Sequence, residues 1–200
     1  MREGEIFYSI NYIKNSSSLP KEFLPKELVI SFKGDMIYSM LKAPFGNSGI
    51  STITNPKESI YDTYLNMFAF RYYYEGSDAE IQPGFSSMAG ITFHETGKKS
   101  EICGFKCNQL EVKIPGSDTV RYVWYTNEIN VTGANLLTPY REIDGILMDF
   151  FYIMGSAEMS FTADEVIVKE ISEKTFEKKK NYKKVSRDYL DSLIRKMISY

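Results

Sequence analysis

Short runs in which apolar and polar residues alternate recur along most of this 200-residue chain, and they limit the fold more than any other feature. An alternation with period two is typical of β-strands that bury one face. Clusters of Gly, Pro, Asn, Asp and Ser separate the runs, which predicts an antiparallel meander of about ten strands. The predicted strands are residues 5–13, 27–33, 36–40, 50–54, 91–94, 102–114, 119–126, 146–154 and 166–171, with two strands or one bent strand over 59–74.

Four short sequences between these runs are typical of turns. Gly34-Asp35 and Asp144-Gly145 are two-residue hairpin signals, and Gly155-Ser156 and Thr96-Gly97-Lys98 predict two further reversals of the chain. We expect each of them to place its flanking strands side by side.

One helix is predicted, near the C-terminal end. Ser186 suits the N-cap position, and Asp188 in the first turn complements the helix dipole. Leu190, Ile194 and the neighbouring apolar residues follow helical spacing, and their common face must pack on the sheet. We therefore expect a single domain, residues 1–200, in which a curved antiparallel sheet over 4–184 precedes an amphipathic helix over 186–199.

Charge and hydropathy exclude two classes of protein. The net charge is only −2, so the chain as a whole does not attract nucleic acid. No stretch approaches 18 uncharged apolar residues, so no transmembrane span is predicted. Residues 173–200 are nonetheless basic, with nine Lys or Arg against four Asp or Glu. This tail could meet an acidic surface, a phospholipid head group or a partner, but we interpret it as a solvated terminal segment.

The cysteines and the single histidine do not indicate a metal site. Cys103 and Cys107 fall on a predicted strand, where a separation of four residues spans about 13 Å, too far for a disulfide unless Gly104 bends the strand. Two thiolates without further ligands make a poor metal site, so we interpret both as small buried hydrophobes. His94 is interpreted as a surface or edge-strand residue.

No catalytic motif is present, so we predict a protein that is not an enzyme, with no catalytic residues, metal or cofactor. An enzyme would need a cleft with perturbed carboxylates around His94. We interpret the remaining candidate carboxylates as solvated or turn residues; they are Glu101, Glu111, Asp144, Asp149, Asp164 and Glu165.

One face of several predicted strands is rich in aromatic residues and methionine. In a closed sheet these side chains would fill the core, whereas in a half-open curved sheet they could line an apolar cavity that fits an acyl chain. The candidate ligand-binding face comprises Tyr8, Tyr12, Tyr38, Met40, Phe68, Phe70, Tyr122, Trp124, Met148, Phe150 and Tyr152.

Parts of the sequence resemble the GLPGLI-type families of secreted Bacteroidetes proteins. Residues 102–107 read ICGFKC, similar to their I-x-G-Y-K-C motif, and residues 123–129 read VWYTNEI, similar to W-Y-T-x-x-I. Residues 144–148 (DGILM) and 176–183 (FEKKKNYK) resemble their later segments. The resemblance implies a LolA-like architecture, an incomplete antiparallel barrel covered by helix. It also implies a periplasmic or outer-membrane-associated protein whose signal sequence was removed.

Together these features suggest a cell-envelope protein that holds an apolar ligand, a lipid or lipidated peptide, on the concave face of its sheet. A lipoprotein or another envelope protein is the expected partner. The alternative is a protein-interaction or assembly module with a solid core and no small-molecule ligand.

Overall fold

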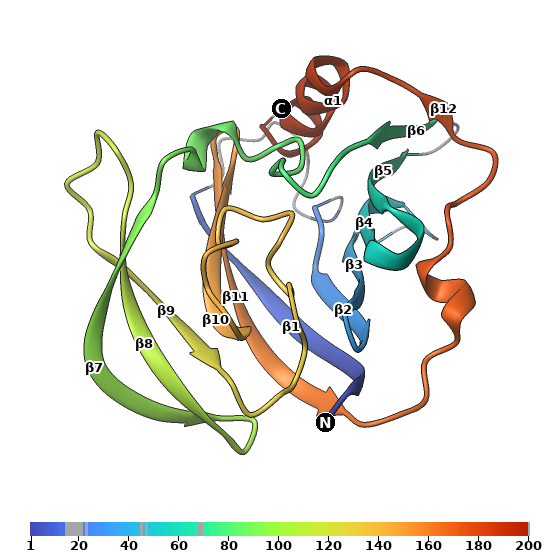
Figure 1. The fold of residues 1–200 in the computed structure, drawn as a ribbon. Coiled ribbons are helices and arrows are strands. Elements are labelled where there is room, and N and C mark those ends of the chain that lie inside the picture. Colours follow the sequence, from blue (N-terminus) through green and yellow to red (C-terminus); the bar gives the residue numbers. More distant parts are fainter. Residues whose placement is uncertain (15–21, 23, 45, 47, 68–69, 200) are drawn as a thin grey trace.

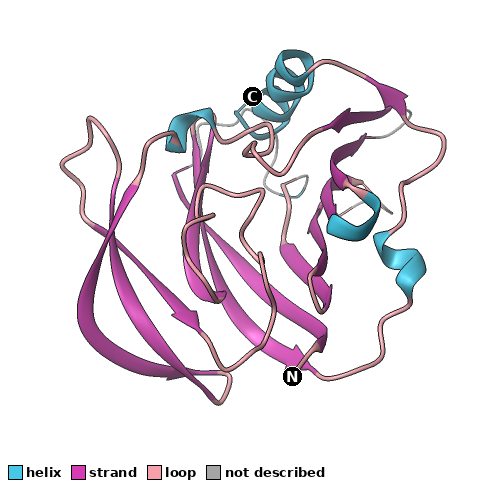
Figure 2. Ribbon diagram, in the orientation of Figure 1, coloured by secondary structure: helices cyan, strands magenta, loops and turns pink. Residues whose placement is uncertain are grey.

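The computed structural model describes residues 1–14, 22, 24–44, 46, 48–67 and 70–199. Within them, twelve strands form one sheet in the order β12-β6-β5-β4-β3-β2-β1-β11-β10-β9-β8-β7 (Figures 1 and 2). The strands are β1 (Glu3–Lys14), β2 (Glu27–Lys33), β3 (Met36–Lys42), β4 (Gly49–Asn55), β5 (Ile60–Met67), β6 (Phe70–Glu75), β7 (Thr92–Ile102), β8 (Phe105–Lys113), β9 (Arg121–Thr126), β10 (Ile146–Met154), β11 (Ala157–Ile167) and β12 (Lys183–Lys184). The helices are η2 (Pro56–Glu58), η3 (Ser86–Met88), η4 (Glu173–Phe176) and α1 (Arg187–Ser199).

The first strand, β1, lies near the centre of the sheet, and each half of the sheet is formed by strands that are consecutive in sequence, apart from the short β12. Strands β2 to β6 are added on one side of β1, whereas β7 to β11 form the other half and end with β11 paired to β1. Neighbours are antiparallel except β12, which runs parallel to β6. Figure 1 shows the two halves curving around the loop of residues 127–145. The prediction of a mostly β, curved and unclosed antiparallel sheet is thus confirmed.

The main core lies between the concave face and this loop. The strand register places Tyr8, Leu28, Leu41, Ile50 and Leu65 in one cross-strand row, and all five are at most 6% exposed. Because directly opposed residues share a face of a sheet, this row is a continuous apolar surface. From the loop, Ile129, Val131, Tyr140 and Ile143 are buried against the same core.

The predicted C-terminal helix is confirmed. The Ser186 hydroxyl accepts a hydrogen bond from the backbone N–H of Tyr189 at 3.3 Å, as an N-cap residue should. Leu190, Ile194 and Ile198 have no exposed surface, so the apolar face of α1 is buried in the main core.

The hairpin of β7 and β8 corrects two predictions. Residues 102–114 are not one strand, because the chain reverses at Cys103 and Gly104, which adopt φ angles of 51° and 79°. The predicted turn at Thr96-Gly97-Lys98 instead lies within β7, where the pairing with β8 shifts register between Glu95 and Lys99. Glycine with positive φ suits a bulge as well as a turn, and sequence alone does not separate the two.

Two later predictions are also wrong. The last long strand is β11 rather than residues 166–171, and it follows directly from the Gly155-Ser156 turn, which was predicted correctly. Asp144-Gly145 does not form a two-residue hairpin; it ends the loop of residues 127–145 and leads into β10. That loop holds its own apolar side chains in the core, so long-range packing, not a local turn, decides its path.

The prediction of a solvated basic tail is wrong in part, because most of its charged residues are exposed but a few apolar side chains pack on the sheet. Residues 168–185, which we call the strap, cross the outer face of the sheet, the face opposite the main core. Phe176 is fully buried and Ile171 is 4% exposed, and both pack in a second apolar cluster with Met36, Ile53 and Tyr64. The strap therefore covers part of the outer face of the half of the sheet from β2 to β6.

Candidate functional site

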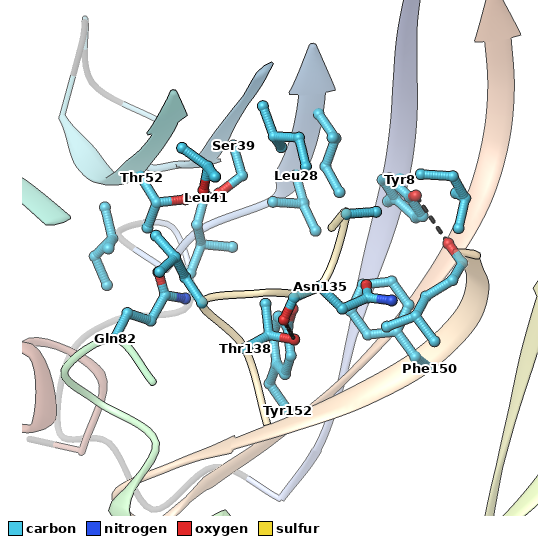
Figure 3. A pocket seen from close by; sticks show the side chains of 18 of the residues that line it. Tyr8, Leu28, Ser39, Leu41, Thr52, Gln82, Asn135, Thr138, Phe150 and Tyr152 are labelled. Carbon is cyan, nitrogen blue, oxygen red and sulfur yellow. Dashed lines mark hydrogen bonds between the residues drawn. The ribbon is translucent and has the colours of Figure 1, made fainter. Parts of the chain in front are cut away.

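The concave face contains a small cavity, shown in Figure 3. The space that the centre of a water-sized molecule can occupy is about 50 Å³, whereas pockets for drug-sized ligands span roughly 300–1,000 Å³. The cavity holds one polar atom without a described hydrogen-bond partner, Oε1 of Gln82. As built, this space fits a few water molecules and not an acyl chain.

The predicted ligand-binding residues do not form one site. Tyr8, Phe150 and Tyr152 line the small cavity, and Met148 is fully buried in the main core. Tyr12 is half-buried, and its hydroxyl donates to the carbonyl of Pro25. Phe68 lies outside the described residues.

Five other predicted residues point away from the concave face or are exposed. Phe70 and Tyr122 are 57% and 44% exposed. On β9 the fully buried apolar residue is Val123, so Tyr122 and Trp124 have the opposite phase from the one predicted. The remaining pair, Tyr38 and Met40, lies on the outer face of β3.

Tyr38 and Met40 line a larger groove on the outer face, which we call the outer groove. It offers about 500 Å³ to water-sized centres, ten times the space of the concave cavity. Its floor consists of cross-strand neighbours that share this face through the strand register. The lining residues are Glu5, Val29, Ser31, Tyr38, Met40, Lys42, Gly46, Gly49, Ser51, Asn66, Arg71, Lys179 and Tyr182.

The strap contributes Lys179 to the groove. Lys179 Nζ donates to the Tyr38 hydroxyl at 3.0 Å and to Ser51 Oγ at 2.8 Å. The same ammonium lies 4.6 Å from the ring centroid of Tyr38 and 5.4 Å from that of Tyr64. These cation–π contacts and hydrogen bonds fix the position of the charge.

The acidic side chain in the groove is already paired. Glu5 Oε2 forms an ion pair with Lys169 at 2.6 Å, and its Oε1 accepts a hydrogen bond from Ser31. Lys42 in turn lies 3.5 Å from Glu27. Lys179 and Arg71 have no carboxylate within 4 Å among the described residues. The groove thus carries two cations without acidic partners.

A cluster of charges beside the groove fastens the strap. Asp62 and Glu75 are opposite each other on β5 and β6, and Lys178 and Lys184 of the strap both pair with Glu75. Hydrogen bonds from these two lysines lower the pKa of Glu75 to about 2. Burial raises the pKa of Asp62, although Tyr64 donates a hydrogen bond to its Oδ2 at 2.7 Å.

A further groove of similar size lies at Asn55, between Glu58 and Glu177, and also contains Lys57 and Lys178. Glu173 lines it as well, so three carboxylates outnumber the two lysines, and Lys178 is already paired with Glu75. Only Met36 and Ile60 supply apolar lining, so that groove offers less contact surface to an apolar ligand than the outer groove.

The sequence-based candidates for chemistry lie elsewhere. His94 is exposed on the edge strand β7, as predicted. Both cysteines are free thiols, as predicted, but Cys103 is exposed at the β7–β8 turn, and only Cys107 is buried. Among the described residues, no group of three His, Cys, Asp or Glu is placed to hold a metal ion. Within the same ranges, no helix is long and apolar enough to cross a membrane.

Sequence reasoning missed Arg71, Lys179 and Asp62. Arg71 and Lys179 are far apart in the chain and carry no motif, so only the course of the strap reveals their proximity to one groove. Asp62 did leave a signal, because it interrupts the apolar face of residues 60–74 that Ile60 and Tyr64 share.

The described residues form a single curved sheet with a packed concave face, and solved structures with a similar fold are known. Two structures of PNGF-II, in space groups C2 and P21, each superpose with a TM-score of 0.60 at 15% sequence identity. The match covers 98% of this chain, which spans only about a third of theirs (33% and 34%). At this identity the similarity establishes the fold alone. No family model and no curated protein matches the sequence.

Proposed function

We propose that this chain is a binding module of the cell envelope, and that its ligand, a lipid or another molecule with an apolar body, occupies the outer groove. The observation that carries the proposal is the size and lining of this groove. Its roughly 500 Å³ falls within the range of small-molecule sites, and Val29, Tyr38, Met40 and Tyr182 supply apolar and aromatic contact surface. The placement in the envelope rests on the sequence resemblance to GLPGLI-type proteins.

The arrangement of the groove favours binding over catalysis. Its carboxylate, Glu5, is held by Lys169 and Ser31, and the Lys179 ammonium is held by two hydroxyls. Groups fixed in this way orient a ligand but are poorly placed to exchange protons with it.

Methionine methyl NMR tests the location of the ligand. Met40 lines the outer groove and Met154 lines the concave cavity, so the two methyl groups report on the two sites independently. With ¹³C-methyl methionine, assigned through Met40→Leu and Met154→Leu, we expect decanol or decanoate to shift the Met40 signal saturably. Met154 should stay in place.

Two results would contradict this proposal. A shift of Met154 instead of Met40 would place the ligand on the concave face, after displacement of the loop of residues 127–145. No saturable shift with decanol, decanoate or decyltrimethylammonium would remove the small-molecule function altogether.

A protein-interaction or assembly role is the second candidate, favoured by an exposed aromatic cluster where β6 meets α1. Phe70 stacks on Tyr72 with centroids 6.2 Å apart, and Tyr189 meets Tyr72 edge-on at 5.7 Å. Phe70 and Tyr189 remain 57% and 47% exposed. Exposed aromatic surface is enriched at protein interfaces. Sedimentation of the wild type and of Phe70→Ser at increasing concentration tests whether this cluster joins two copies.

A further inference from the structure

We infer that the ligand of the outer groove carries a single acidic group, a carboxylate or a phosphate, which Lys179 and Arg71 bind. This inference rests on the proposed function and specifies the class of ligand: an organic anion with an apolar body.

The first argument is the charge of the groove. Its ionisable side chains, tyrosines aside, are Glu5, Lys42, Arg71 and Lys179. Glu5 and Lys42 are neutralised by Lys169 and Glu27, so the charge that remains is that of Arg71 and Lys179. The net charge of the whole chain is −2, so this positive site is a local feature. Cations without partners in a concave site favour anionic ligands.

The second argument is the hydrogen-bonding geometry of Lys179. A lysine ammonium has three N–H donors. Tyr38 and Ser51 accept two of them, and among the described residues nothing accepts the third. An ammonium held by two hydroxyls and two aromatic rings is already immobilised, so a carboxylate or phosphate oxygen could accept this donor without a large further loss of side-chain entropy.

The third argument is the position of Arg71. It lies on β6 at the end of the cross-strand row Lys42, Gly49, Asn66 and Arg71, and its exposed guanidinium lines the same groove as Lys179. A guanidinium binds carboxylate and phosphate with paired donors. The apolar part of the ligand would then lie along Tyr38, Met40 and Val29, on the adjoining part of the floor.

Calorimetry with a series of ten-carbon amphiphiles tests the inference. Decanoate, decyl phosphate, decanol and decyltrimethylammonium share one apolar chain and differ in the head group, and inorganic phosphate supplies a head group without the chain. We expect decanoate and decyl phosphate to bind at least about tenfold more tightly than decanol. Decyltrimethylammonium should bind most weakly, and inorganic phosphate should bind far more weakly than decyl phosphate.

Substitutions show which cations produce the preference for an acidic head group. Lys179→Met removes the charge at similar length and should abolish most of the preference for decanoate over decanol, whereas Lys180→Met, at the exposed neighbouring position, should preserve it. Arg71→Met provides an independent variant because Arg71 does not hold the strap. It should reduce the preference by several fold with an unchanged melting temperature.

The outcomes separate this inference from the proposed function. Equal affinity for decanol and decanoate, or an undiminished preference in both Lys179→Met and Arg71→Met, would overturn the inference and leave an apolar binding site. Equal affinity for inorganic phosphate and decyl phosphate would overturn the assignment of an apolar body. Failure of every amphiphile to bind would overturn both.

Discussion

Arg121 on β9 and Glu158 on β11 form a two-point ion pair across the intervening strand β10, with Nε–Oε1 at 2.7 Å and Nη2–Oε2 at 3.0 Å. Their side chains are only 12% and 9% exposed, and the guanidinium lies 5.4 Å from the ring centroid of Phe151. The pair joins two strands that share no backbone hydrogen bonds.

Breaking this pair should be costly, because the remaining charge would be left buried. We expect Glu158→Ala to lower the free energy of unfolding by about 3 kcal/mol in urea denaturation. Replacing both partners, as Arg121→Met with Glu158→Leu, should recover most of the loss. Lys113→Ala, which removes an exposed ion pair to Glu111, is the control and should change stability by less than about 1 kcal/mol. A similar small effect of Glu158→Ala would show that the pair is not structural.

The ion pairs of Glu75 predict a loss of stability in acid. Because its pKa is lowered from 4.5 to about 2 in the folded state, its contribution is present above pH 4.5 and disappears as the pH falls toward 2. The melting temperature of Glu75→Gln should therefore lie below that of the wild type at pH 6, and the two should converge near pH 2. Because burial raises the pKa of Asp62, its contribution to stability changes with pH in the opposite direction. Asp62 is present in both proteins, so the difference between their melting temperatures reports on Glu75 alone.

Two comparisons check this assignment. The melting temperature of Glu101→Gln, a substitution at an exposed position, should stay close to that of the wild type from pH 6 to pH 2. Glu75 is 40% exposed, so 1 M salt should shrink the effect. A constant difference between wild type and Glu75→Gln from pH 6 to pH 2 would contradict the assignment.

Phe176 should hold the strap on the sheet. Its side chain is fully buried in the second apolar cluster, and the nearby amide of Lys179 donates to the Tyr64 hydroxyl at 3.1 Å. Phe176→Ala deletes a buried ring, a change that costs about 3–5 kcal/mol in protein cores. We expect faster hydrogen exchange of the Lys179 amide and loss of ligand binding in the outer groove.

The exchange of amides in β8 and β9 should remain slow in Phe176→Ala, because the strap packs on β3 to β6, on the other side of β1. Val168→Ala, at a position that is 69% exposed, is the matched control within the strap and should exchange like the wild type. Unchanged protection of Lys179 in Phe176→Ala would mean that other contacts hold the strap.

Two glycines with positive φ should respond differently to alanine. At Gly97 (φ 72°) an added Cβ meets nothing within 4 Å, so Gly97→Ala should cost only the backbone strain, about 1–2 kcal/mol. At Gly84 (φ 103°) the same Cβ would lie 2.9 Å from Ile194 Cγ2, against α1. Gly84→Ala should therefore cost about 1–3 kcal/mol more than Gly97→Ala in urea denaturation. Equal costs would show that α1 can shift to accommodate the methyl group.

Local patterns predicted those elements whose signals lie within a few residues. The Gly34-Asp35 turn and the Ser186 N-cap were both recognised from sequence, because a hairpin turn and a helix cap depend on adjacent residues. The same turn determines which face of β3 is inward: pairing Lys33 with Met36 directs Ile37 and Leu41 to the core.

The candidate site could not be predicted in the same way. Tyr38 and Met40 alternate with Ile37 and Leu41, so both faces of β3 are apolar, and the period-two pattern of β3 alone does not identify the inner face without the register that the turn imposes. The outer face is apolar because the strap covers part of it, and the strap lies more than 120 residues further along the chain. The alternation of apolar and polar residues within one strand contains no information about a segment so far along the chain.

The pairing of β1 with β11 has a consequence for the order of folding. β1 pairs with β11, which lies about 150 residues further along the chain. The hydrogen bond from the Ser9 hydroxyl to the carbonyl of Thr162 illustrates this separation. During synthesis, β1 to β6 can form a growing sheet, but one edge of β1 must stay open until β11 has left the ribosome. Contacts of such long range slow folding, and an unpaired edge is prone to pair with other chains. A nascent chain that stops before residue 157 would thus present a vacant strand edge to any chaperone or neighbour.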